Sequence, residues 1–189
     1  MGLRDFARLR GDAPLNPFDF ARFANLFVVN IERIKGLSSQ SRELLLGPAS
    51  EEWSGGACSR PLPDGRRIVV LNPNHAPART NATLMEEICH VFLGHKPNRL
   101  AVISDEERGQ TLARDYRKLD EEAAYAIGAA ALVPFAALRR AVLEGKSAAD
   151  VARHFRVSRD LIEYRLKVTR LWRIYKGRFG PRIYADGRG

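Results

Sequence analysis

Hydrophobic and polar positions divide the chain into a first third of short, strand-like and helical segments and a longer helical remainder. Residues 17–25 predict a short helix that begins after Asn16, with proline at its first position. Residues 26–34, LFVVNIERI, begin as a continuous apolar run and end in alternation, which predicts a strand. A second short helix is expected at residues 38–46, closed by Gly47.

A hairpin is predicted next along the chain. Two strand-like runs, residues 53–60 and 66–72, flank the sequence PLPDG. The Asp-Gly pair is typical of hairpin turns because glycine adopts positive φ without steric cost. The first third is therefore expected to form a small antiparallel sheet with helices packed against it.

Helices are predicted for most of the chain from residue 81 onward. Residues 84–93 have the composition of a buried helix, and the glycine directly after them is a typical helix stop. Further helices are expected over residues 105–119, 120–133 and 134–144, and Pro134 ends or kinks the second of these. Two more helices are expected in the remaining part. Together these elements predict an α+β fold.

Composition places the chain among ordinary globular proteins, with 45% hydrophobic and 28% charged residues in 189. We divide it into a core of residues 1–134 and a basic helical extension of residues 135–189, packed on the core. No apolar run reaches the roughly 20 residues that span a bilayer, and the N-terminus has no apolar signal-peptide core. With only Cys58 and Cys89, a disulfide framework is excluded, so we expect a cytoplasmic protein without a membrane partner.

The net charge of +9 is located entirely in residues 135–189, because residues 1–134 contain as many acidic as basic side chains. An anionic partner would therefore meet the C-terminal part of the chain. A solvated cationic surface with no such partner explains the same asymmetry equally well.

Residues 83–95, TLMEEICHVFLGH, carry the pattern with the most chemical content. On a helix, residues four apart share a face, so Glu86 and His90 lie together, and Glu87 is close to both. In the zinc-protease pattern HExxH, two histidines bind the metal and the glutamate activates the attacking water. This chain has EExxH in the same frame. The carboxylate that replaces one imidazole also binds Zn²⁺, and it suits Mn²⁺ better than imidazole does.

Ordinary structural roles remain open for the same residues. Thr83 and Glu86 have the spacing of a capping box, in which Glu86 reaches back to the start of the helix. Glu87 is also explained as an exposed helix residue, and His90 as a hydrogen-bonded core histidine. Against these roles, adjacent carboxylates in so apolar a helix are costly unless they are paired or bound to a metal.

A third metal ligand is expected from the segment DEEAAYAIGAAALVP, residues 120–134. Its small residues allow the helix to approach its neighbour closely, which would bring Glu121 or Glu122 near His90. Acidic residues are also common in the first turn of a helix because they interact favourably with its dipole, so a structural role stays open.

Three further residues are weaker candidates. His95 follows Gly94 and either folds back toward the site as a substitute ligand or caps the last carbonyls of the helix. His75 lies in a proline-rich loop. Cys89 is expected to be a small core residue rather than a ligand or nucleophile.

The frame TLMEEICHVFLGH, followed by EEAAYAIGAAALVP, resembles the ImmA/IrrE family of metallopeptidase-like proteins over roughly residues 15–173. The resemblance implies a zincin-like metallopeptidase domain, a hydrolase with bound Zn²⁺ or Mn²⁺. It also implies a protein partner, a helix-turn-helix repressor, and a place in phages, mobile elements or stress responses.

By position, the resemblance puts Glu86 where the family has its first metal-binding histidine. Glu87 stands at the general base and His90 at the second metal-binding histidine. The family's third ligand falls on Glu121 or Glu122. Counting back from Pro134 instead places this ligand one residue after Glu122.

Residues 147–166 have the spacing of a helix-turn-helix. Ala152 is small where two helices would cross, Val157 would pack the turn, and Ser158 would cap the second helix. This helix and the residues after it are expected to expose basic side chains that contact DNA phosphates. The four candidates are Arg159, Arg165, Lys167 and Arg170. Helix pairs with this spacing also serve only for packing.

The sequence thus supports two hypotheses. In the first, the protein is a metal-dependent endopeptidase that acts on a transcriptional regulator. Glu87 is then the general base, and Glu86, His90 and Glu122 or Glu121 hold the metal. In the second, it is a catalytically inactive, peptidase-like regulator that binds a repressor or DNA through its basic helices.

Overall fold

The computed structural model of the chain describes residues 3–6, 8–9, 11–34, 37–58, 60–95, 100–101, 113–114 and 118–179. Contacts between residues divide the chain into two compact units. One unit is Asn16–Ala129, and the other combines Met1–Leu15 with Ala130–Gly189. The boundary falls inside helix α5 (Lys118–Leu132). All the residues expected to bind a metal therefore belong to the first unit, and all those expected to contact DNA belong to the second.

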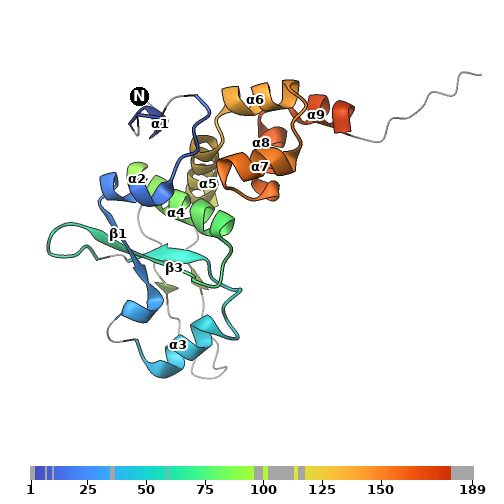
Figure 1. Cartoon of the computed structure of the whole chain (residues 1–189). Helices are drawn as coiled ribbons and strands as arrows, with labels where there is room; N and C mark the ends of the chain where they lie inside the picture. The colour runs from blue at the N-terminus through green and yellow to red at the C-terminus, as the bar shows by residue number, and fades with distance from the viewer. Residues whose placement is uncertain are drawn as a thin grey trace, which may run out of the picture. The chain divides into compact units, whose positions relative to one another are not determined.

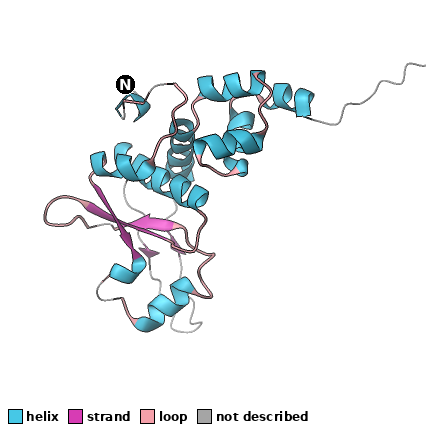
Figure 2. Ribbon diagram, in the orientation of Figure 1, coloured by secondary structure: helices cyan, strands magenta, loops and turns pink. Residues whose placement is uncertain are grey.

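The unit Asn16–Ala129 contains a three-stranded sheet (Figures 1 and 2). Strand β3 (Arg67–Leu71) lies in the centre and pairs antiparallel with β2 (Gly55–Ala57), which confirms the predicted hairpin. Gly65 in its turn has φ of 81°. On its other side β3 pairs in parallel with β1 (Leu26–Asn30). The expectation of a purely antiparallel sheet is wrong because a long connection, which includes a helix, lets β1 and β3 run in the same direction.

The helices predicted over residues 17–25, 38–46, 84–93 and 120–133 of this unit are present, and the one over 84–93 differs in extent. The side chain of Asn16 accepts a hydrogen bond at the start of α2 (Pro17–Phe23), as expected. The strand predicted over residues 26–34 is wrong in its second half, because the side chain of Asn30 accepts from the backbone nitrogen of Glu32 and caps a short 3-10 helix, η1 (Ile31–Arg33). Helix α3 (Ser39–Leu46), which Ser38 caps, follows before β2. Helix α4 (Pro77–Phe92) begins earlier than predicted, at a proline, with no side-chain cap.

A short ladder of β4 (Leu100–Ala101) and β5 (Ala113–Arg114) completes the unit. Strand β5 contradicts the helix expected over residues 105–119 at these two positions. Residues 105–112 and 115–117 of that expected helix lie outside the described residues.

The core of this unit lies where α4 packs on α2 and on strands β2 and β3 (Figure 1). Almost fully buried apolar side chains fill it: Phe20, Ala21, Leu26, Val69, Leu84, Met85, Ile88 and Cys89. Burial of so many side chains from one helix fixes the orientation of α4. The acidic residues and the histidine of α4 consequently lie at the edge of the core, where they are half-buried.

The second unit is helical in its described part. Besides the end of α5 it contains α1 (Leu3–Phe6), α6 (Phe135–Leu143), α7 (Ala148–Phe155), α8 (Arg159–Val168) and α9 (Trp172–Phe179). Ser147 and Asp150 form a capping box at the start of α7, and the side chain of Ser158 caps α8. Ala152 and Val157 are buried as predicted. Helix α9 was not separately expected.

Among the described helices, none is both long and apolar enough to cross a membrane alone; α5 and α6 meet those criteria only as a bent pair. Both cysteines are free, and Cys89 is fully buried while Cys58 is exposed.

Candidate metal centre

Helices α4 and α5 approach each other closely because α5 carries a glycine at their contact. A Cβ atom built on Gly128 would lie 3.4 Å from the Cγ of Met85 and 3.6 Å from both the Sγ of Cys89 and the backbone nitrogen of Glu86. A larger side chain at this position would push the two helices apart. The small-residue face predicted from the sequence therefore brings the first turn of α5 to the acidic face of α4.

Three side chains meet between these helices. Glu86 and His90 come from α4 and Glu121 from α5, and each offers a ligand atom within 4.8 Å of the other two. The Nε2 of His90 lies 3.5 Å from an Oε2 of Glu121. These two side chains are 19% and 22% exposed, so the group lies at the edge of the protein interior rather than deep within it.

The electrostatics of this group favour a bound cation. Burial, together with the carboxylates of Glu121 and Glu87, raises the pKa of Glu86 from 4.5 to about 7. A positive charge among these carboxylates would relieve their mutual repulsion. Burial lowers the pKa of His90 despite the opposing effect of Glu121. Its imidazole is therefore neutral at pH 7, which is the form that donates a lone pair to a metal.

The donor set itself fits a divalent cation. Two carboxylates and one imidazole are ligands that Zn²⁺ accepts, and the acidic majority also suits Mn²⁺. Glu87 directly follows Glu86 on α4 and is half-buried. It is close enough for its charge to affect the pKa of Glu86, although it is not one of the three clustered donors.

The sequence left open whether Glu86 caps its helix and which of Glu121 and Glu122 approaches His90, and the structure answers both questions. Thr83 lies inside α4 rather than at its start, so the capping-box role for Glu86 is wrong. Glu122 is 58% exposed, and its carboxylate lies 3.7 Å from the Nζ of Lys118. The structure thus brings Glu121 to His90, while Glu122 lies on the solvent side of α5.

His95 folds back onto the preceding helix. Gly94 has φ of 67°, a left-handed conformation that reverses the chain, and the His95 backbone nitrogen donates to the carbonyl of His90 at 3.0 Å. The two histidines have their Nδ1 atoms 3.0 Å apart. The Nε2 of His95 lies 3.8 Å from an Oδ1 of Asp120. Sequence reasoning did not single out Asp120, although it lies directly before Glu121 in the first turn of α5.

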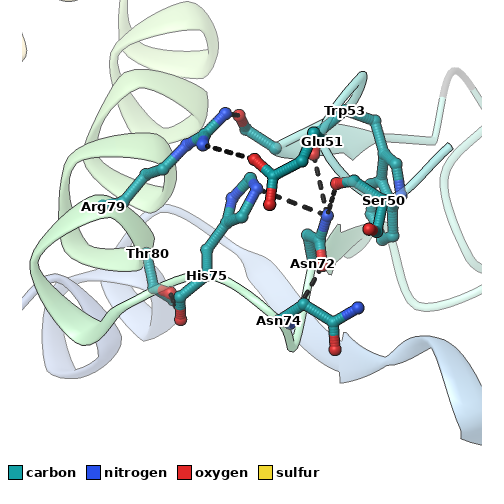
Figure 3. Close-up of polar contacts among 9 residues, drawn as sticks. Ser50, Glu51, Trp53, Asn72, Asn74, His75, Arg79 and Thr80 are labelled. Carbon is teal, nitrogen blue, oxygen red and sulfur yellow. Dashed lines mark hydrogen bonds and ion pairs between the residues drawn. The ribbon is translucent and has the colours of Figure 1, made fainter. Parts of the chain in front are cut away.

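His75 is separate from this group and belongs to a network around Asn72 (Figure 3). The side-chain amide of Asn72 donates to the carbonyls of Ser50 and Trp53 at 2.6 and 2.9 Å. Its oxygen accepts from the backbone of Asn74, and its nitrogen lies 3.4 Å from the Nε2 of His75. This network holds the loop that leads into α4.

Cys89 is a core residue, as expected. Burial, with a smaller effect of the Glu86 charge, raises the pKa of its thiol to about 12. The thiol therefore stays protonated at neutral pH in the metal-free protein, which disfavours nucleophilic attack, and Cys89 is not one of the three clustered donors.

The basic residues expected to face DNA have different environments. Arg165 is only 7% exposed, and its Nε donates to the carbonyl of Val133, so the expectation that it faces solvent is wrong. Its position on α8 coincides with the buried face of that helix. Arg159 is exposed but forms an ion pair with Glu163, with N and O 2.8 Å apart. Lys167 and Arg170 are exposed.

Comparison of the chain with models of known protein families gives one match. A model of the peptidase M78 family, described as the IrrE N-terminal-like domain, matches residues 51–167. The matched segment contains β2, β3, α4 and α5, and hence all three clustered donors. No curated protein and no solved structure matches the chain.

Proposed function

This chain belongs to the peptidase M78 family of IrrE N-terminal-like domains, and we propose that it is a metal-dependent endopeptidase that cleaves a transcriptional regulator in the cytoplasm. One observation carries the proposal: Glu86, His90 and Glu121 converge, with ligand atoms within 4.8 Å of one another. A catalytic zinc site needs three protein ligands and an open position for the reaction. Partial exposure of the three side chains supports access of a peptide.

The proposal includes a zincin-like fold. In such a fold an active-site helix that carries two ligands packs against a sheet, and a following helix supplies the third ligand. Helix α4 packs on β2 and β3, and α5 carries Glu121. Both features support the assignment.

The residues have distinct roles in peptide hydrolysis. Glu86, His90 and Glu121 hold the cation, which, when bound, lowers the pKa of a water molecule toward about 7 and polarises the scissile carbonyl. Glu87 accepts a proton from the attacking water, and the water oxygen bonds to the carbonyl carbon. As the C–N bond breaks, the same carboxyl returns that proton to the leaving nitrogen.

The substrate class rests on the resemblance to ImmA/IrrE proteins, which are linked to helix-turn-helix repressors. The test is incubation of the protein, reconstituted with Zn²⁺ or Mn²⁺, with a panel of purified helix-turn-helix repressors and with unfolded casein as reference. We expect specific cleavage of a repressor, loss of cleavage with a chelator and recovery when the metal is restored. A metal-loaded protein that binds a repressor without cleaving it would support the inactive regulator instead.

A second function, binding of DNA by the helical unit, is favoured by a group of cations on α8, on α9 and in the turn between them. The group consists of Lys167, Arg170, Arg173 and Lys176, all exposed. The Nζ atoms of Lys167 and Lys176 each lie 5.3 Å from the ring centroid of Trp172. Within the described part of the chain, none of the four forms an ion pair with a carboxylate. Unpaired cations of this kind are suited to DNA phosphates.

The salt dependence of DNA binding tests this second function. If Lys167 and Arg170 contact phosphates, their replacement by glutamine should reduce the slope of log K against log salt by about 1 for each lost contact. Arg153→Gln is the matched control, because Arg153 already pairs with Asp150 and its loss should change the slope less. An unchanged slope in the double variant would exclude these residues as phosphate contacts.

A further inference from the structure

Four polar side chains of α4, α5 and the turn after α4 form a line that extends beyond the three clustered donors. Glu121 faces the Nε2 of His90 at 3.5 Å, and the two imidazoles meet through their Nδ1 atoms at 3.0 Å. The Nε2 of His95 in turn faces Asp120 at 3.8 Å. The order along the line is therefore carboxylate, imidazole, imidazole, carboxylate.

The number of protons on this line is the significant feature. A neutral imidazole carries one N–H, so two neutral rings supply two protons. One proton could lie in each of three contacts: His90 with Glu121, His90 with His95, and the longer contact of His95 with Asp120. With both rings neutral, both carboxylates ionised and no cation, one of the two longer contacts lacks a proton and two acceptors face each other there, because two lone pairs at 3.0 Å would repel strongly.

A cation on the Nε2 of His90 removes this mismatch. Held by His90 and Glu121, it would take the place of the missing proton at their contact. The Nδ1–H of His90 then donates to the Nδ1 of His95, and the Nε2–H of His95 faces the carboxylate of Asp120. All three contacts are satisfied with both rings neutral.

We propose that Asp120 and His95 are positioning residues that hold His90 as its Nδ1–H tautomer and direct its Nε2 lone pair toward the cation. This inference rests on the proposed function for the presence of that cation. Metal-binding histidines usually donate their second N–H to a carboxylate or carbonyl, which fixes the ring and strengthens the ligand. Here a second imidazole, itself oriented by Asp120, takes that role.

The geometry distinguishes this role from direct binding by His95. Its Nδ1 is directed at His90 and its Nε2 at Asp120. His95 is not one of the three donors that lie within 4.8 Å of one another. The turn at Gly94 and the hydrogen bond from the His95 backbone to the carbonyl of His90 hold it in this place.

Nuclear magnetic resonance of the ¹⁵N-labelled protein tests the contact itself. At pH 8 the metal-free protein should show a ¹⁵N–¹⁵N scalar coupling between the Nδ1 atoms of His90 and His95, transmitted across the hydrogen bond. With Zn²⁺ added, His95 should be the Nε2–H tautomer. Absence of the coupling, or a His95 proton on Nδ1 in the Zn²⁺-loaded protein, would overturn the proposal. Because the first measurement needs no cation, it separates this proposal from the peptidase activity.

Zinc affinity, measured by competition with a chromogenic chelator, tests whether the contact between His90 and His95 strengthens metal binding. His95→Leu should weaken Zn²⁺ binding by about 10–100-fold, because His90 loses the acceptor for its Nδ1–H. His95→Asn places an amide oxygen near the position of the lost Nδ1 and should keep most of the affinity. Asp120→Asn should weaken binding, since the group that orients His95 loses its charge.

His154→Leu is the matched control, because His154 lies in the other unit, where its Nε2 contacts the carbonyl of Asp12. Its Zn²⁺ affinity should equal that of the wild type. Wild-type affinity in His95→Leu, or equal losses in the leucine and asparagine variants, would show that His95 has only a packing role. Absence of Zn²⁺ binding by the wild type would instead contradict the peptidase proposal and leave the coupling as the test of the histidine contact.

Discussion

Replacement of Glu87 by glutamine is expected to leave the cation bound and to slow peptide hydrolysis by at least about 10²-fold. Glutamine has nearly the same size and shape but cannot accept a proton from water. The three clustered donors, Glu86, His90 and Glu121, are unchanged in this variant. Cleavage under single-turnover conditions, together with metal content by elemental analysis, separates loss of the base from loss of the cation.

The matched control is Glu122→Gln. It makes the same chemical change on α5, at a side chain that is 58% exposed and paired with Lys118. Its cleavage rate and metal content should both match those of the wild type. If Glu87→Gln cleaves at the wild-type rate, Glu87 is not the base. If it loses the metal as well as activity, Glu87 holds the cation instead.

Replacement of Glu86 by glutamine is expected to abolish tight binding of the cation and yet to stabilise the metal-free protein at alkaline pH. Burial and the neighbouring carboxylates raise the pKa of Glu86 from 4.5 to about 7 in the folded state. Below pH 4.5 the group is protonated in the folded and unfolded states alike, and it costs no stability. As the pH rises toward 7, only the unfolded state loses its proton freely, and the free energy of unfolding decreases. Above pH 7 the whole cost is present.

Glutamine removes this cost because it carries no charge. In the metal-free protein, the free energy of unfolding of Glu86→Gln at pH 8 should exceed that of the wild type by about 1–3 kcal/mol, and the difference should vanish near pH 4. Urea denaturation in the presence of a chelator measures both. Glu122→Gln serves again as the control and should show no comparable gain. A Glu86→Gln variant that is less stable than the wild type at pH 8 would refute this account of the site.

The same arrangement lowers the stability of the metal-free protein. Carboxylates that repel one another destabilise the metal-free fold, and a ligand that binds only the folded state restores the stability. Zn²⁺ should therefore raise the unfolding midpoint of the wild type and leave that of Glu86→Gln almost unchanged. A site of this kind links folding to occupancy by the cation.

Local rules predicted much of the fold. Asn16 and Ser158 each cap the helix that follows them, as predicted, because a short polar side chain directly before a helix accepts from its free backbone N–H groups. The hairpin also followed from its turn. The parallel pairing of β1 with β3 did not, since it depends on the path of a long connection and on no local pattern.

Helix periodicity predicted the part of the site that lies on α4, but it did not identify the residue that α5 contributes. Spacing on α4 placed Glu86 beside His90, whereas the choice between Glu121 and Glu122 depends on the rotation of α5 about its axis. Packing at Gly128 contributes to that rotation. Arg165 was misjudged because a long side chain can lie along a buried face and bond to a backbone carbonyl, which composition does not reveal. The contact of Asp120 with His95 joins residues of separate elements and required the three-dimensional structure.

The most direct test of the central claim is the metal content of the protein, purified without affinity resin or chelator and measured by native mass spectrometry after addition of Zn²⁺ or Mn²⁺. If Glu86, His90 and Glu121 form a cation site, the chain should retain about one divalent ion, and His90→Ala should retain none. A wild-type protein that remains metal-free, or a His90→Ala variant that binds the ion as tightly as the wild type, would contradict it.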